Sequence, residues 1–144
     1  MLYELKRTFG AAPIDLSDAL FVIDTDIYAG ADGVSDTPAT AGVLDYESEN
    51  QHFPAENTLE IYGWETADSA EDTAGLAVTL QSSEDGESWK DEFLLNFTQA
   101  DIVADKLIYR STIPAHTGQK VRLKLTVGTE VFTAGKVLAT VRPL

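Results

Sequence analysis

The stretch QKVRLKLTV, at positions 119–127, alternates between apolar and polar residues. Its apolar positions are Val121, Leu123, Leu125 and Val127. The polar positions between and before them are Lys120, Arg122, Lys124 and Thr126. Because successive side chains of a β-strand point to opposite faces, this alternation predicts a strand with one face in a core and the other toward solvent. The outward face is expected to carry a basic strip.

Five further stretches carry strand signals. TLEIYGWET (58–66) and GLAVTLQSS (75–83) alternate in the same way. The other three are short runs with apolar residues and turn residues at their ends, namely ALFVIDTDIYAG (19–30), KLIYRSTIP (106–114) and EVFTAGKVLATV (130–141). About eight short strands separated by turns predict an all-β fold, an antiparallel β-sandwich of jelly-roll type.

The connections between these stretches are rich in turn residues. The run SSEDGESW (82–89) holds Asp85-Gly86 between two strand-like stretches, and Asp-Gly supplies the positive φ that a tight hairpin turn needs. Gly128-Thr129 likewise predicts a two-residue hairpin loop. Small and polar residues dominate from Ala29 to Asn57, which predicts a long N-terminal loop or arm at 29–57. No linker divides the chain, so we expect one domain over 1–144.

The charge of the chain is strongly acidic and unevenly distributed. Its 144 residues include 10 Lys and Arg and 24 Asp and Glu, a net charge of −14. Residues 1–105 hold 3 basic and 23 acidic residues, and residues 106–144 hold 7 basic and 1 acidic residue. This balance argues against a nucleic-acid partner, and no apolar run is long enough to predict a membrane span. Two interpretations stay open: a soluble acidic surface, or two faces of opposite charge that dock on a neighbour in a lattice.

Candidate catalytic residues are few. His52 and His116 lie in connectors beside or near prolines, and neither belongs to a G-x-S-x-G elbow. Acidic residues are so abundant that carboxylate pairs such as Glu60 and Glu65 are expected by chance. The acids within 24–36 do not fit a calcium-binding EF-hand loop, which needs glycine where this chain has alanine; a cation site of another kind, or solvated Asp residues, are the two interpretations left. We therefore expect no enzyme, no catalytic residue, no metal and no cofactor; the chain also lacks cysteine.

Aromatic residues leave a second class of function open. Tyr62, Trp64 and Trp89 would form a platform for a sugar ring if they were exposed, as in a carbohydrate-binding β-sandwich module or a virion lectin. The opposing interpretation places both tryptophans in the core, because an aromatic side chain buries a large area. A sugar-binding Asp-box does not fit, because that motif has a residue between its Asp and Gly, whereas Asp85 and Gly86 are adjacent.

Three segments, in order, resemble the small capsid cement, or decoration, proteins of tailed phages of the Bordetella-phage type. The segments are LAVTLQSSEDGESWKD, IPAHTGQKVRLKLTVG and FTAGKVLATV. In that family a strand ends in S-x-D-G before an aromatic residue, a strand follows a proline and a glycine, and an F-T-A-G arm ends the chain. The matching positions are Ser83, Asp85, Gly86, Trp89, Pro114, Gly118, Val121, Arg122, Leu123, Phe132, Thr133, Ala134 and Gly135.

The resemblance implies a jelly-roll homotrimer that binds the outside of an icosahedral shell and clamps neighbouring major capsid proteins. It implies a location on the capsid surface of a virion that is assembled in the host cytoplasm. The interface is expected to use the basic strip together with two acids of the loop or arm at 29–57, which could lie across a neighbour. These residues are Lys120, Arg122, Lys124, Asp32 and Asp36.

Overall fold

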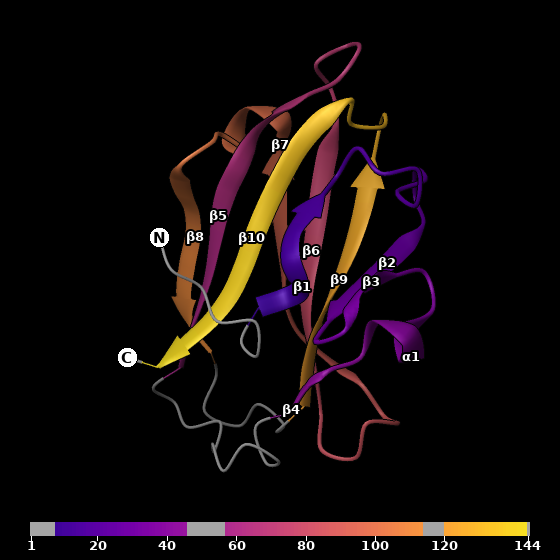
Figure 1. Cartoon of the computed structure of the whole chain (residues 1–144), viewed down its shortest axis with the longest axis vertical. Helices are drawn as coiled ribbons and strands as arrows, with labels where there is room; N and C mark the ends of the chain where they lie inside the picture. The colour runs from indigo at the N-terminus through magenta and orange to yellow at the C-terminus, as the bar shows by residue number, and fades with distance from the viewer. Residues whose placement is uncertain (1–7, 46–56, 114–119, 144) are drawn as a thin grey trace.

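The computed structural model describes residues 8–45, 57–113 and 120–143, and it consists of two antiparallel β-sheets packed face to face (Figure 1). The four-stranded sheet has the order β1 (Thr8–Asp15), β10 (Ala134–Pro143), β5 (Asn57–Asp68), β8 (Lys106–Thr112). The six-stranded sheet has the order β3 (Gly33–Ser35), β2 (Asp26–Gly30), β9 (Lys120–Gly128), β6 (Gly75–Ser83), β7 (Lys90–Thr98), and β4 (Leu44–Asp45) also pairs with β9. Two short helices, α1 (Pro38–Ala41) and the 3₁₀ turn η2 (Gln99–Asp101), lie between strands.

The pairing of the strands is that of a jelly roll. β1 pairs with β10, β2 with β9, β5 with β8, and β6 with β7, all antiparallel. This nested pairing makes one long two-stranded ribbon, which is rolled up so that β10 also pairs with β5 and β9 also pairs with β6. The all-β jelly-roll sandwich predicted from the sequence is therefore confirmed, with eight main strands and the two short strands β3 and β4.

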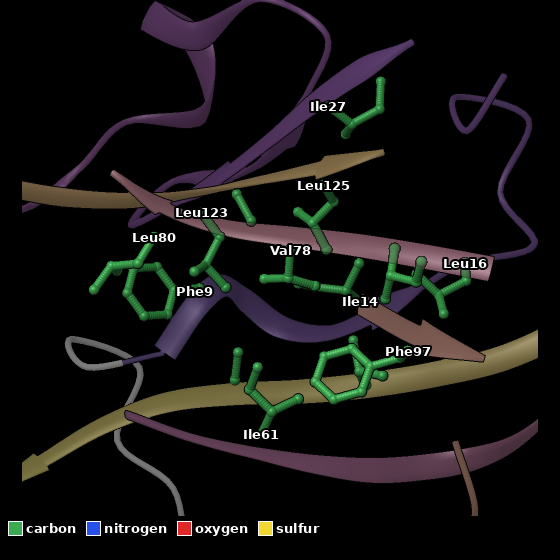
Figure 2. Close-up of a cluster of buried hydrophobic side chains, with 14 of the residues drawn as sticks. Phe9, Ile14, Leu16, Ile27, Ile61, Val78, Leu80, Phe97, Leu123 and Leu125 are labelled. Carbon is green, nitrogen blue, oxygen red and sulfur yellow. The ribbon is translucent and has the colours of Figure 1, made fainter. Parts of the chain in front are cut away.

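Apolar side chains from the inner faces of the two sheets form the core (Figure 2). Phe9 and Ile61 come from the four-stranded sheet, and Leu80 and Leu123 come from the six-stranded sheet. The alternation of β9 is confirmed, since its four apolar residues are each at most 1% exposed: Val121, Leu123, Leu125 and Val127. Burial of a side chain of this size stabilises a fold by about 1.5–3 kcal/mol, so this period decides which face of β9 turns inward.

The hairpin predicted at Asp85-Gly86 is confirmed, and the one predicted at Gly128-Thr129 is wrong. β6 and β7 pair as neighbours around the turn, and Gly86 has a φ of 81°. β9 pairs with β2, β4 and β6, whereas β10 pairs with β1 and β5. The segment after Gly128 therefore crosses from one sheet to the other, although Thr129 does have the positive φ, 74°, that the turn chemistry suggested.

The edge strand β1 was not predicted from the sequence. Its register against β10 shifts between Phe9 and Ile14, which marks an irregular stretch of the strand. Within that stretch Gly10 has a φ of 85° and Ala11 a φ of 61°. Positive φ values interrupt the regular alternation that identifies a strand, so the bulge hides the pattern that β9 shows clearly.

The N-terminal region expected to be a strand and then an arm is more structured than its composition suggests. Of the stretch 19–30, Asp26–Gly30 forms strand β2, and turns precede it. Within 29–45 the chain forms β3, α1 and β4, and Ala29 and Ala41 are fully buried. Residues 46–56 of the predicted arm, which include His52, lie outside the described residues. Pro114, His116 and Gly118 lie outside them too.

Candidate functional site: the outer face of the six-stranded sheet

The outer face of the six-stranded sheet carries the basic strip. β9 lies between β2 and β6, and Lys120, Arg122 and Lys124 point away from the core because Val121 and Leu123 point into it. The register places residues of the neighbouring strands beside the strip. These pairs are Ser83 with Lys120, Gln81 with Arg122, and both Thr79 and Tyr28 with Lys124.

Arg122 is buried on this outer face, at 8% exposure. Its guanidinium carbon lies 3.9 Å from the centre of the Trp89 ring and 4.7 Å from the centre of the Tyr28 ring. Its Nε donates a hydrogen bond of 2.8 Å to Oε1 of Gln81. Both ring distances are within the reach of a cation–π interaction. Burial lowers the pKa of Arg122, and Tyr28 acts in the opposite direction. The stack joins β2, β9 and the β6–β7 turn.

The two lysines of the strip differ in their surroundings. Nζ of Lys120 lies 3.1 Å from Oδ2 of Asp45 on β4, in a half-buried ion pair. Lys124 makes no hydrogen bond or ion pair with any residue in the described ranges, and it is half-buried. Of the three predicted cations, Lys124 is therefore the one whose charge is available to a partner.

The two acids predicted for the interface flank β3, at one edge of this sheet. Asp32 follows β2 in the turn to β3, where its backbone N–H donates to the carbonyl of Ala41. Asp36 follows β3, and its Oδ1 accepts a hydrogen bond of 3.3 Å from the hydroxyl of Thr37. Both carboxylates are exposed. The structure thus places the five predicted residues on the same sheet and its adjoining turns.

The β6–β7 turn is organised by one carboxylate. Oδ1 of Asp85 accepts hydrogen bonds from the backbone N–H of Ser88 (2.9 Å) and of Glu87 (2.8 Å), and from the hydroxyl of Ser83 (3.0 Å). These bonds lower the pKa of Asp85 to about 2, with the N–H of Ser88 contributing most. An open depression of about 400 Å³ adjoins the turn. It is lined by Ser82, Ser83, Glu84, Asp85, Ser88, Lys90 and Glu92.

The structure bears on two kinds of ligand, a metal ion and a sugar. Across the described ranges, no group of three or more His, Asp or Glu side chains is arranged to hold a metal ion. The three aromatic residues proposed as a sugar platform are separated. Tyr62 and Trp64 lie on β5 in the four-stranded sheet, whereas Trp89 leads into β7 in the other sheet. Trp64 is 43% exposed, so it is not a core residue as one interpretation expected.

A second polar cluster, on the outer face of the four-stranded sheet, was not predicted from the sequence. Glu60 of β5 is buried, and its carboxylate lies 3.2 Å from Arg142 of β10 and 3.8 Å from Arg110 of β8. The hydroxyl of Tyr62 donates to Glu60 at 3.0 Å, and the pKa of Tyr62 is raised by its burial and by this bond. The sequence does indicate that Glu60 faces outward, because it holds a polar position in an alternating strand. Its arginine partners could not be predicted, because they lie on strands distant in the sequence.

The basic residues of the C-terminal part are therefore divided between both sheets. Lys120, Arg122 and Lys124 lie on the six-stranded sheet, and Arg110 and Arg142 lie on the four-stranded one. Segregation of charge along the sequence does not produce a single basic face, because β9 and its neighbours in sequence, β8 and β10, belong to different sheets.

The acidic loop between β5 and β6 is held by Glu130, an acid from the C-terminal part of the chain. Its carboxylate accepts hydrogen bonds from the hydroxyl of Ser69 (2.6 Å), the N–H of Thr73 (2.7 Å) and the N–H of Glu71 (3.0 Å). These bonds lower the pKa of Glu130 to about 2, the Ser69 hydroxyl most of all. The side chain of Gln99 in η2 also contacts the Ser69 hydroxyl, and its amide N–H donates to Asp72. The loop is thereby attached to the body of the sandwich.

No family model matches the chain, and no curated protein matches it. None of the helices in the described residues is long and apolar enough to cross a membrane.

Proposed function

We propose that the chain is a structural cement, or decoration, protein of an icosahedral tailed-phage capsid. It binds the outside of the shell, clamps neighbouring major capsid proteins, and acts as a homotrimer on the virion surface after assembly in the host cytoplasm. It performs no reaction in this role. The resemblance of three ordered segments motivates the proposal, and the jelly-roll fold that the resemblance implies is the fold of this chain.

The observation that carries the proposal is the Tyr28–Arg122–Trp89 stack on the outer face of the six-stranded sheet. A cement protein works through many modest contacts spread over an area, so its docking face benefits from being rigid before it binds. The stack fixes β2, β9 and the β6–β7 turn relative to one another. Lys124 beside it supplies an available positive charge, which favours an acidic patch on the shell.

The chemistry of such docking is electrostatic and geometric. The ammonium of Lys124 and the carboxylates of Asp32 and Asp36 can each pair with opposite charges on a neighbour. Exposed pairs of this kind are screened by salt, with a Debye length of about 10 Å at 0.1 M and about 3 Å at 1 M. Attachment is therefore expected to weaken as the ionic strength rises.

The test uses empty shells assembled from the major capsid protein encoded in the same genome as this chain. Wild-type chain is expected to sediment with these shells and to raise the temperature at which they break open. Lys124→Glu should weaken co-sedimentation, most clearly at low salt. Lys106→Glu, an equal change of charge on β8 of the other sheet, is the matched control. A genome without a major capsid protein, or shells that leave the wild-type chain in the supernatant, would overturn the proposal.

A carbohydrate-binding module or virion lectin is the second candidate, and the exposure of Trp64 favours it. A tryptophan that is 43% exposed on a sheet face can stack against a sugar ring. A glycan array probed with wild-type chain and with Trp64→Ala tests this candidate. Binding that the substitution abolishes supports it, and an array without signal removes it.

A further inference from the structure

The outer face of the four-stranded sheet has a surplus of positive charge around one buried carboxylate. Glu60 lies on β5, between Arg110 on β8 and Arg142 on β10. The side chains of the two arginines are 58% and 60% exposed, whereas that of Glu60 is 4% exposed. Two guanidinium groups therefore share one carboxylate, and each has N–H donors left for another acceptor.

Apolar side chains lie on the same face. Leu107 of β8 is directly opposite Tyr62 of β5 and is 40% exposed. Trp64 continues the outward row of β5, where Glu60 and Tyr62 precede it. Arginine, tryptophan and tyrosine are the residues that contribute most at protein–protein interfaces, and a charged group beside an exposed apolar patch is typical of such a surface.

The most acidic turn in the described residues is at the other sheet. The turn itself, residues 84–89, has three carboxylates, at Glu84, Asp85 and Glu87, and the first residues of β7 add Asp91, Glu92 and the ammonium of Lys90. Glu84 and Glu87 are exposed and bond through their side chains to none of the described residues. This turn connects β6 and β7, at the end of the six-stranded sheet where Lys120 lies.

The basic face and the acidic turn of one chain cannot meet. The face points outward from the four-stranded sheet, and the turn belongs to the sheet on the opposite side of the core. These two surfaces can therefore meet each other only between two copies. A contact that joins different surfaces of two identical chains is heterologous, and it generates a closed ring or an open filament.

We propose that copies of this chain associate head to tail, with the β6–β7 turn of one copy on the Arg110–Arg142 face of the next. Glu84 and Glu87 pair with the two guanidinium groups, while Trp64 and Leu107 supply the apolar contact beside them. The inference rests on the part of the proposed function in which copies associate, and it is independent of shell binding.

The test measures self-association of the isolated chain by sedimentation velocity at low and high salt. Wild-type chain should form oligomers whose dissociation constant rises with salt, because the pairs are exposed. Arg110→Gln/Arg142→Gln and, separately, Glu84→Lys/Glu87→Lys should each weaken association by about tenfold or more. The second pair lies on an exposed turn, so it tests the interface even if the arginine variant folds poorly. Glu71→Lys, a charge reversal on the exposed loop between β5 and β6, at the other end of β6 from the β6–β7 turn, should leave association unchanged.

Mixing the two double variants gives the decisive result. The arginine variant keeps a native acidic turn, and the turn variant keeps a native basic face, so together they have one intact contact. The mixture should form one-to-one heterodimers and nothing larger, while each variant alone stays monomeric. A wild-type chain that is monomeric at all concentrations, association unaffected by both double variants, or a mixture that does not pair would overturn the inference. Shell binding is measured separately, so failure of one proposal is distinguishable from failure of the other.

Discussion

The guanidinium group of Arg122 lies over the ring of Trp89, with its central carbon 3.9 Å from the ring centre. Trp89 follows the β6–β7 turn, and Arg122 lies on β9 in the middle of the six-stranded sheet. The contact buries an arginine on the outer surface of a sandwich and attaches a turn to the strand that crosses the face. A residue expected to be an exposed member of a basic strip is thus part of the architecture of that face.

Breaking this stack is expected to destabilise the fold moderately. Trp89→Ala removes one ring and should lower the free energy of unfolding by about 1–2 kcal/mol, the worth of a partly desolvated cation–π contact. Arg122→Ala also removes the donor to the buried amide oxygen of Gln81 and should cost about 2–3 kcal/mol. Urea unfolding of both variants and of the double variant measures the coupling. Trp64→Ala is the control and should cost less than Trp89→Ala; equal costs would contradict the assignment.

The acidic loop should give the protein a specific sensitivity to acid. The folded pKa of Glu130, about 2, is depressed from an ordinary 4.5, so its ionised form stabilises the native state above about pH 4.5. That contribution is lost as the pH falls toward 2. Wild type should therefore lose stability over this window. Glu130→Gln should be less stable at neutral pH, and its difference from wild type should shrink as the pH falls.

The measurement is the urea midpoint of unfolding at pH 7, about 4 and about 2.5. Glu71→Gln, which removes an exposed carboxylate from the same loop, is the control and should follow the wild type at every pH. A difference between Glu130→Gln and wild type that stays constant across the window would show that the carboxylate does not hold the loop.

Gly63 is expected to tolerate no side chain. A Cβ built there would lie 1.9 Å from the carbonyl oxygen of Val103, which is backbone and cannot move aside as a side-chain end can. Gly63→Ala should destabilise the protein by about 3 kcal/mol or more. Gly75→Ala, whose Cβ would meet Phe97 at an ordinary 3.6 Å, is the matched control and should be nearly neutral. Thermal unfolding of the two variants is the measurement. Similar unfolding midpoints would contradict the close approach of position 63 to the Val103 carbonyl.

The two arginines around Glu60 should matter more together than Glu60 itself. Removing both leaves a buried carboxylate without a cation, whereas Glu60→Gln leaves two arginines that are largely exposed. We expect Arg110→Gln/Arg142→Gln to cost about 2–3 kcal/mol of unfolding free energy and Glu60→Gln about 1 kcal/mol. Denaturant titrations at neutral pH compare them. If Glu60→Gln costs more unfolding free energy than the double arginine variant, the two ion pairs contribute little to stability.

Much of the fold is predictable because the alternation within a single strand shows which of its residues are buried. β9 alternates without interruption, and the period places Val121 and Leu123 in the core. β1 could not be found this way, since the positive φ of Gly10 and Ala11 breaks the alternation. Turn chemistry predicts a hairpin after Gly128 because it is a local property. Whether the next strand pairs with β9 or crosses to the other sheet depends on the pairing of the whole ribbon.

The candidate site was predictable only in part. Alternation correctly places Lys120, Arg122 and Lys124 on the outward face of β9. It does not reveal that Arg122 is covered, because Tyr28 and Trp89 reach it from another strand and a turn. The cluster around Glu60 has the same origin, in residues brought together by three strands that are far apart in the sequence.

Decoration of a shell is tested most directly by cryo-electron microscopy of empty shells, assembled from the major capsid protein of the same genome, with and without added chain. We predict extra density of sandwich size on the outer surface, with the six-stranded sheet toward the shell and Lys124 at the contact. Shells whose outer surface is identical in the two maps, at a chain concentration that saturates every available position, would contradict the proposed function.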